Sequence, residues 1–335
     1  MQIRQVDVHD DASFLDFHTA CRAGLLHDRP YATYWSVPEA ALFFRRPNRE
    51  VASSCWVAYD GERPVGGAVS QVPLLDNRDM YLLGVTTVPD ARARGVGTAL
   101  LDVVLEDAKA HGRSTLIADV HYPVDAPADH PDRRFAERHG FDLANVELHR
   151  VCELPLAEDL LEQLARHAAS HHGDYELRTF TGPVPEELLA SYVHNANHLA
   201  LDAPTGDLDF EAAAMTPDSY REREQLFADQ GRSTYATVAV DADGQVVAHT
   251  VIGVPPADQD PENVYQWATL VARGHRGHRL GTAVKVANLR AVQRELPDRL
   301  RVHTSNAEAN GPMVAINELL GFGVVEVNAE FQRRL

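Results

Sequence analysis

The chain has 335 residues, 44% of them hydrophobic and 24% charged, which suits two globular domains and excludes a disordered chain. Its 49 acidic residues outnumber 31 basic ones, and the net charge of −18 excludes the broad basic surface that nucleic-acid binding requires. No apolar run approaches the roughly 18 residues that span a bilayer, and no signal peptide is evident. The three cysteines, Cys21, Cys55 and Cys152, lack metal-ligand or redox spacing. We expect a soluble, cytoplasmic protein without a metal, a nucleic-acid partner or membrane contact.

The first half of the chain predicts strands and helices in alternation. Period-2 and period-3.6 patterns of apolar residues identify the elements, and Asp60-Gly61 is a hairpin turn signal. The expected order is strand Gln2–Val8, helices Asp11–His27 and about Val37–Phe44, strands Ala52–Tyr59, Pro64–Val72 and Met80–Val88, helix Val96–His111, strand Ser114–His121, and a helix ending at Gly140-Phe141.

The second half predicts a similar series after a linking helix that contains the sequence EDLLEQLARHAAS. Asp243-Gly244 again marks a hairpin. The expected order is strand Glu176–Phe180, helix Pro185–Leu199, strands Thr234–Val240, Gln245–Gly253 and Val264–Ala272, helix Leu280–Arg294, strand Arg299–Ser305, and a helix ending at Gly321-Phe322.

Two short sequences recur at matching places in these halves. Gly97-Thr98-Ala99 returns as Gly281-Thr282-Ala283, and Gly140-Phe141 returns as Gly321-Phe322. Because the order of strand, turn, helix, strand and helix is also shared, one structural plan is used twice. The sequence therefore predicts an N-terminal domain over 1–157, a linking helix over 158–174 and a C-terminal domain over 175–335.

The turn from Val88 to Thr98 has the chemistry of a phosphate site. A strand that enters a glycine-containing loop and then a helix directs several backbone N–H groups to one place, and the helix dipole favours an anion there. Arg92 and Arg94 add positive charge. No Gly-Lys-Ser/Thr follows, and Leu100 stands where the dinucleotide fingerprint has its third glycine. A tight turn with exposed arginines is the alternative that these residues leave open.

The longer pattern Arg92-x-x-Gly95-x-Gly97, after a strand and Pro89, resembles the acetyl-CoA loop of the GNAT acetyltransferase superfamily. The second loop resembles it with Arg279 in place of the glycine at Gly95. The resemblance implies an α/β fold of two GNAT-like domains, each a mixed, splayed β-sheet flanked by helices, with pantetheine between the splayed strands. The cofactor-binding residues that it implies are Val88, Arg92, Ala93, Arg94, Gly95, Val96, Gly97, Thr98, Arg276, Gly277, His278, Arg279, Leu280, Gly281, Thr282 and Asn310.

The resemblance also implies where catalytic groups lie. Members of the family commonly begin the helix before Gly-Phe with an asparagine and carry a tyrosine four residues before the glycine. The second half has Asn310 and Asn317 at these places, and the first has Asp129 and Ala136.

Many members place a glutamate on the strand before the loop, where this chain has Tyr81 and Tyr265. A neutral His303 on the next strand is a candidate base. The catalytic candidates are Tyr265, His303 and Asn317, although packing or satisfied polar residues are the alternative explanation of each.

The expected activity is transfer of an acetyl group from acetyl-CoA to a primary amine of a small molecule, by direct attack in a ternary complex. If only one half turns over, Asn310 favours the C-terminal half. The alternative is a non-catalytic CoA-binding or assembly protein with decayed active sites. The acceptor's identity stays open, and so does a homodimer.

Overall fold

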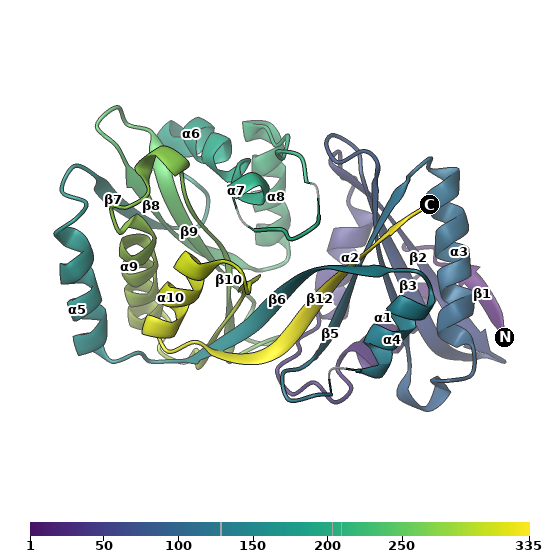
Figure 1. Cartoon of the computed structure of the whole chain (residues 1–335). Helices are drawn as coiled ribbons and strands as arrows, with labels where there is room; N and C mark the ends of the chain where they lie inside the picture. Colours follow the sequence, from purple (N-terminus) through teal and green to yellow (C-terminus); the bar gives the residue numbers. More distant parts are fainter. Residues whose placement is uncertain (128, 203, 209) are drawn as a thin grey trace. The chain divides into compact units, whose positions relative to one another are not determined.

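The computed structural model describes residues 1–127, 129–202, 204–208 and 210–335 (Figure 1). The chain forms two compact units. Unit 1 consists of Met1–Val146, Gly206–Leu208 and Glu326–Leu335, and unit 2 of Glu147–Thr205 and Asp209–Val325. Among the described residues, no helix has the length and apolar character needed to cross a membrane.

Unit 1 is a mixed sheet with helices on both faces. Its sheet has the order β1-β2-β3-β4-β5-β12, in which β4 and β5 are parallel and the other neighbours antiparallel. The elements are β1 (Gln2–Gln5), α1 (Asp11–Leu25), α2 (Val37–Arg45), β2 (Val51–Asp60), β3 (Arg63–Pro73), β4 (Met80–Thr87), η1 (Pro89–Ala91), α3 (Val96–Ala110), β5 (Thr115–Pro123), α4 (Pro131–Arg138) and β12 (Gly323–Arg334). Strand β6 (Asp142–Glu153) begins in unit 1 and continues in unit 2.

Alternation along β2 explains the layers of unit 1. Cys55 and Val57 pack with residues of α1 and α2, whereas Trp56 and Ala58 pack with residues of α3. Successive side chains of a strand point to opposite faces, so each face buries its own apolar layer.

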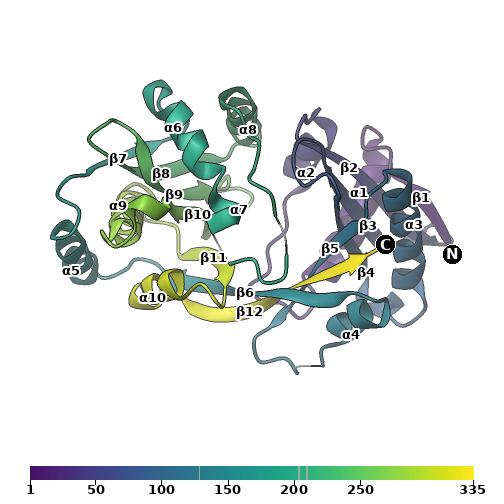
Figure 2. The ribbon, with the colours of Figure 1, turned by 45° about the horizontal axis from the view of Figure 1, so that its top comes forward.

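Unit 2 repeats this arrangement, with the sheet order β6-β11-β10-β9-β8-β7. In Figure 2, α6 lies on one side of its strands and α9 on the other, as the separate apolar clusters of the two helices require. The elements are α5 (Glu158–Ala169), β7 (Glu176–Thr181), α6 (Glu186–Ala196), α7 (Leu199–Asp202), α8 (Pro217–Asp229), β8 (Ser233–Val240), β9 (Val246–Val254), β10 (Asn263–Val271), η2 (Arg273–His275), α9 (Leu280–Glu295), β11 (Arg301–Ala307) and α10 (Gly311–Leu319).

The final strand of each sequence repeat belongs to the sheet of the other unit. Residues Glu147–Glu153 of β6 pair with β11, and residues Glu326–Arg334 of β12 pair antiparallel with β5. Figure 1 shows the yellow C-terminal strand beside β5. The domain boundaries predicted at residues 157 and 175 follow the sequence repeat and stay a prediction.

The predicted series of elements is present, with two differences. Helix α8 and the strands β6 and β12 are present in addition to the predicted elements. The helix predicted over Pro185–Leu199 ends at Ala196, and a short α7 follows it. Asn197 ends α6, because its side chain donates to the backbone carbonyl of Met215 at 2.9 Å and holds the returning chain.

Candidate functional site

In unit 1 the parallel strands β4 and β5 separate halfway along their length. They pair from Met80 opposite Thr115 to Leu83 opposite Ala118, and beyond this point β4 has no described partner in β5. The Val88 N–H donates to Val65 in β3 at 3.1 Å. Since backbone groups alternate between the two edges of a strand, the N–H groups of Thr87 and Val85 point to the β5 side. The splayed edge therefore presents backbone donors.

The predicted cofactor loop lies at the end of β4. Ala93 and Gly95 have left-handed backbone angles, with φ of 60° and 83°, and Gly95 caps α3. The first helical bond runs from Ala99 N to Gly95 O at 3.0 Å, so the N–H groups of Val96, Gly97 and Thr98 lack an acceptor within the helix. Residues 92–95 are exposed. The loop thus offers backbone donors and two arginines to an anion.

The two glycines of this loop have different roles. A Cβ on Gly95 would meet nothing within 4 Å, so Gly95 is needed for its positive φ. A Cβ on Gly97 would lie 3.3 Å from the Phe135 ring of α4. Gly281 in unit 2 repeats the second role, because its Cβ would lie 3.2 Å from Ile316 of α10. The recurring glycine therefore lets the two helices approach each other.

Unit 2 has the same splay and the same loop conformation. Strands β10 and β11 pair only from Asn263 opposite Arg301 to Tyr265 opposite His303. Gly277 and Arg279 have φ of 87° and 56°, matching Ala93 and Gly95 in position and in sign.

The arginine in place of glycine therefore leaves the backbone path intact, although the left-handed conformation costs a non-glycine residue roughly 1–2 kcal/mol. The Arg279 side chain is exposed.

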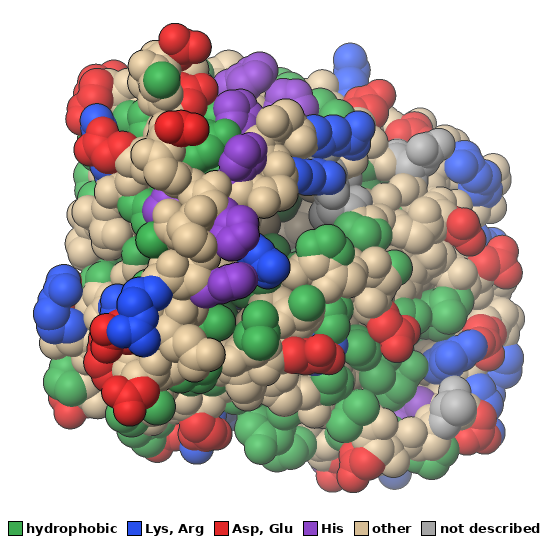
Figure 3. Space-filling view, turned by 60° about the vertical axis from the view of Figure 1, so that its left-hand side comes forward, with side chains coloured by type: hydrophobic (Ala, Val, Ile, Leu, Met, Phe, Trp, Pro, Cys, Tyr) green, Lys and Arg blue, Asp and Glu red, His purple; other side chains and the backbone are tan. Residues whose placement is uncertain are grey.

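Histidines surround the second loop. Tyr175 Oη lies 3.0 Å from His275 Nδ1, and its ring lies 5.4 Å from that of His278. His278 Nδ1 lies 3.2 Å from the carbonyl oxygen of His171. Figure 3 shows histidine side chains gathered on one face of the molecule near lysine or arginine side chains. Among the described residues, no group of three or more His, Cys, Asp or Glu has metal-binding geometry.

The remaining predicted cofactor residues contribute mainly backbone or cap interactions. The side chains of Val88, Val96, Leu280 and Thr282 are buried. The side chain of Asn310 accepts from Met313 N at 3.4 Å and caps α10. Thr98 Oγ1 lies 3.2 Å from His139 Nε2, while Arg276 donates to the Val271 carbonyl at 3.3 Å.

Tyr81 and Tyr265 have equivalent sequence positions but face opposite sides of their sheets. Tyr81 is buried in the apolar cluster that contains α3, and its hydroxyl donates to Asp107 at 2.5 Å. In unit 2, β10 contains a bulge between Gln266 and Ala268, with Trp267 as the extra residue. One inserted residue reverses the face of every side chain before it. Tyr265 therefore lies on the face away from α9, beside His303.

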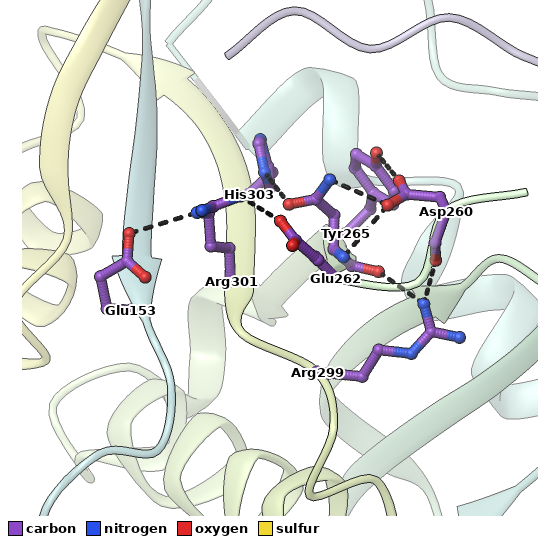
Figure 4. Close-up of polar contacts among 8 residues, drawn as sticks. Glu153, Asp260, Glu262, Tyr265, Arg299, Arg301 and His303 are labelled. Atoms are coloured by element: carbon purple, nitrogen blue, oxygen red, sulfur yellow. Dashed lines mark hydrogen bonds and ion pairs between the residues drawn. The ribbon is translucent and has the colours of Figure 1, made fainter. Parts of the chain in front are cut away.

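A chain of hydrogen bonds links Tyr265 and His303 through the loop before β10 (Figure 4). Tyr265 donates to Asp260 Oδ2 at 2.6 Å, and Asp260 Oδ1 accepts from the Asn263 amide at 2.9 Å. The Asn263 Oδ1 then faces His303 Nε2 at 2.9 Å, and His303 Nδ1 lies 3.0 Å from His149 Nε2. Because an amide oxygen only accepts, His303 Nε2 is the donor to Asn263 Oδ1.

The arginines next to this chain of hydrogen bonds have partners of their own. Arg301 donates to Glu262 at 2.8 Å and lies 3.4 Å from Glu153. Arg299 donates to the backbone carbonyl oxygens of Asp260 and Pro255, the latter at 2.7 Å. The loop that carries Asp260 is therefore fixed by buried backbone contacts.

Asn317 lies on the other face of the unit 2 sheet. It is fully buried, and it donates to Asn306 Oδ1 at 2.9 Å. Asn306 and His303 are an odd number of positions apart on β11, so their side chains point to opposite faces. The structure therefore brings Tyr265 and His303 together, with rings 5.3 Å apart, and does not bring Asn317 to them.

Asn317 instead belongs to a buried network around Lys285, which the sequence analysis missed. Lys285 Nζ donates to Asn317 Oδ1 at 2.6 Å and lies 5.2 Å from the centre of the Phe322 ring. Burial lowers the pKa of Lys285 from 10.5 to about 7, and Cys152 raises it slightly. A single lysine inside the apolar stretch of α9 was the signal available in the sequence. His149 had no comparable signal, because its strand was not predicted.

Comparison with known proteins agrees with these features. Residues 22–141 match the model of the acetyltransferase (GNAT) family. The whole chain is similar to the solved structure of a tandem GNAT protein from the clavulanic acid biosynthesis pathway, with 27% identity, 99% of this chain and 98% of that chain covered, and a TM-score of 0.79. Residues 22–141 carry the GNAT family match, and the chain as a whole has the fold of a tandem GNAT protein. The predicted α/β fold of two splayed sheets is confirmed.

Solved structures of lower sequence identity share the fold of this chain. One is a glucosamine N-acetyltransferase region of a fungal multi-domain β-N-acetylglucosaminidase, at 15% identity and a TM-score of 0.68, covering 99% of this chain and 38% of that one. Another is a GCN5-related N-acetyltransferase from Sphaerobacter thermophilus, at 16% identity and a TM-score of 0.64, covering 99% and 95%. A search of curated proteins found no significant match.

Proposed function

We propose that this protein transfers the acetyl group of acetyl-CoA to a primary amine of a small molecule, directly and in a ternary complex. The observation that carries the proposal is the opening of β4 from β5 next to the N-terminus of α3. That opening places backbone donors along β4, and the N–H groups of Val96, Gly97 and Thr98, which have no acceptor within the helix, lie at its end. The match to an acetyltransferase family supports acyl transfer, while the donor and the acceptor are inferred from the site.

The residues of unit 1 fit a CoA molecule. The N–H groups of Val96, Gly97 and Thr98, with Arg92 and Arg94 beside them, would hold the pyrophosphate. The N–H of Val85 or Thr87 would hydrogen-bond the thioester carbonyl, where negative charge develops during attack. The bound acetyl-CoA supplies an activated acyl group. In unit 2, Arg276–Thr282 would hold a pyrophosphate in the same way, and the positive charge of Arg279 would add to the attraction.

Direct transfer is favoured by the state of the cysteines. Cys21, Cys55 and Cys152 are all buried. Burial raises the pKa of Cys21 to about 12 and that of Cys152 to about 11, and it raises the pKa of Cys55 as well. A thiol needs its thiolate form to act as a nucleophile. An acetyl-cysteine intermediate is therefore disfavoured at neutral pH.

In unit 2, Tyr265 and His303 are proposed to contact the acceptor. They lie where β10 and β11 part, and His149 extends the chain of imidazoles from His303. Both ring nitrogens of His303 already have partners, Nε2 in Asn263 and Nδ1 in His149, so the predicted role of His303 as a base requires one of these contacts to open. The role of Asn317 near the departing thiol stays a prediction, since the structure holds it in the Lys285 network.

The test combines acetyl-CoA binding with release of free CoA thiol across a panel of primary amines. Valine at Gly95 forces a β-branched residue into the left-handed region and should abolish binding to unit 1. The matched control is Gly112→Val at the other end of α3, where φ is 64° and a Cβ also meets nothing within 4 Å. Equal binding by both variants would contradict the site. Binding without thiol release from any amine would favour the non-catalytic CoA-binding protein.

A further inference from the structure

A pair of carboxylates stands at the point where the strands of unit 1 separate. Asp119 follows Ala118, the last residue of β5 that pairs with β4. Leu116, Ala118, Val120 and Tyr122 pack in the apolar cluster of α3, so Asp119 points to the opposite face, the face of α1. Glu330 of β12 lies directly opposite Asp119 in the ladder. The strand that closes the sheet thus supplies the second carboxylate.

This pair is unfavourable in the protein by itself. Like charges directly opposite in adjacent strands repel each other. Asp119 is exposed to solvent and Glu330 is half-buried. Crowding by neighbouring groups and then the charge of Glu330 raise the pKa of Asp119, and burial raises the pKa of Glu330. Among the described residues neither carboxylate pairs with a Lys or Arg, and Glu330 accepts only from the Asn145 amide at 2.5 Å.

The neighbouring carboxylate on β12 is treated differently. Glu326 forms a bidentate ion pair with Arg29, at 2.9 and 2.8 Å. The fold therefore neutralises one acid of this face and leaves two without a cation. A positive charge from outside the chain would relieve the repulsion between the two opposed carboxylates, and the exposure of Asp119 leaves the pair open to it.

A third group on the same face also lacks a partner. Asn328 lies between Glu326 and Glu330 in β12, opposite His121, and shares their face because the three are two positions apart. Its side chain is 8% exposed. In the part of the chain that the structure describes, its Oδ1 accepts no hydrogen bond. A buried acceptor without a donor costs roughly 1–3 kcal/mol, so a ligand that donates there is favoured.

We propose that Asp119, Glu330 and Asn328 bind the cationic amino group of the acetyl acceptor in unit 1. A primary ammonium carries one positive charge and three donors, which matches two carboxylates and one amide oxygen. The inference rests on the proposed function and specifies it: the acceptor is a cationic amine, and unit 1 binds it next to the splayed edge that holds the donor. The acceptor site depends on the C-terminal strand.

Calorimetric titration of the full chain with pentane-1,5-diamine tests this assignment, with pentane-1,5-diol as the uncharged comparison. The wild type should bind the diamine and not the diol. Asp119→Asn and Glu330→Gln should each weaken diamine binding at least tenfold. The control Asp102→Asn removes an exposed carboxylate on α3 and should leave the affinity unchanged. Equal affinity in all four proteins would overturn the proposal, and so would Mg²⁺ that binds at this pair and displaces the diamine.

Asn328→Leu provides a second test that does not need turnover. If Asn328 stabilises the fold, its replacement should lower the melting temperature. If its Oδ1 is an acceptor for a ligand, the melting temperature of Asn328→Leu should be equal to that of the wild type or higher, while diamine binding weakens. A lower melting temperature with unchanged diamine binding would refute the role of Asn328. Failure of the proposed function would appear separately, as no thiol release by the wild type with any amine.

Discussion

Replacing Lys285 with methionine should stabilise the protein at neutral pH and remove one step of its pH dependence. Burial lowers the pKa of Lys285 from 10.5 to about 7. One pH unit of difference corresponds to about 1.4 kcal/mol, so the charged lysine disfavours the folded state by up to ~5 kcal/mol. Methionine is an unbranched apolar side chain one heavy atom shorter than lysine, and it leaves Asn317 Oδ1 without its donor, at a cost of roughly 1–3 kcal/mol. The expected net gain at pH 7 is about 2–4 kcal/mol.

The sign of the pH dependence follows from the lowered pKa. Between pH 7 and 10.5 the unfolded chain binds a proton at Lys285 that the folded chain does not. Wild-type stability therefore rises with pH in this window, by about 1.4 kcal/mol per pH unit, relative to Lys285→Met. Below pH 7 both states are protonated and the difference between the two proteins is constant.

Urea unfolding at pH 7, 8 and 9 measures this difference, and NMR of labelled lysine measures its cause. The chain contains only two lysines, Lys109 and Lys285, so the spectrum of Lys285→Met identifies the Lys285 signal. That signal should titrate near pH 7, well below the ordinary lysine value of 10.5. Titration of the Lys285 signal near 10.5, with parallel stability curves for the two proteins, would refute the reasoning.

Three further predictions concern the loops and the exchanged strand. Arg279→Gly should raise the free energy of unfolding by about 1 kcal/mol, because glycine adopts the left-handed backbone without strain; an unchanged urea midpoint would contradict this. Gly97→Val should lower the free energy of unfolding by about 1–3 kcal/mol, and the melting temperature with it, because the valine side chain would press on the Phe135 ring; Gly97→Ala should lower the free energy of unfolding less. Deletion of Glu326–Leu335 should expose β5 to limited proteolysis while peptides of unit 2 stay protected, since β12 pairs with β5 along its length. Equal protection of both units would show that β12 is dispensable.

The sequence alone determined the local features of the cofactor loops. Glycine at position 95 and the following apolar helix predict a loop that enters a helix, and the structure has Gly95 as the N-cap of α3 with φ of 83°. These features depend on neighbouring residues only, because glycine propensity and helical periodicity are local properties. The repeat of Gly97 as Gly281 likewise predicted two equivalent units, since both glycines permit the same approach between two helices.

The faces of the strands were decided by tertiary structure. Tyr81 and Tyr265 stand at the same distance from their loops, yet the bulge at Trp267 turns Tyr265 to the opposite face. A bulge depends on the pairing of β10 with β9, and pairing involves residues distant in sequence. Counting residues from the loop could not detect it.

The partners of the buried groups were also decided by tertiary structure. Glu330 stands 211 positions after Asp119 in the numbering, and only the exchange of the final strands brings them opposite each other. Lys285 meets Asn317 because α9 and α10 pack together, not because of their spacing. Local pattern fixes which elements form and how they begin and end. Long-range pairing fixes which charges meet, and therefore which pKa values shift and where a ligand is needed.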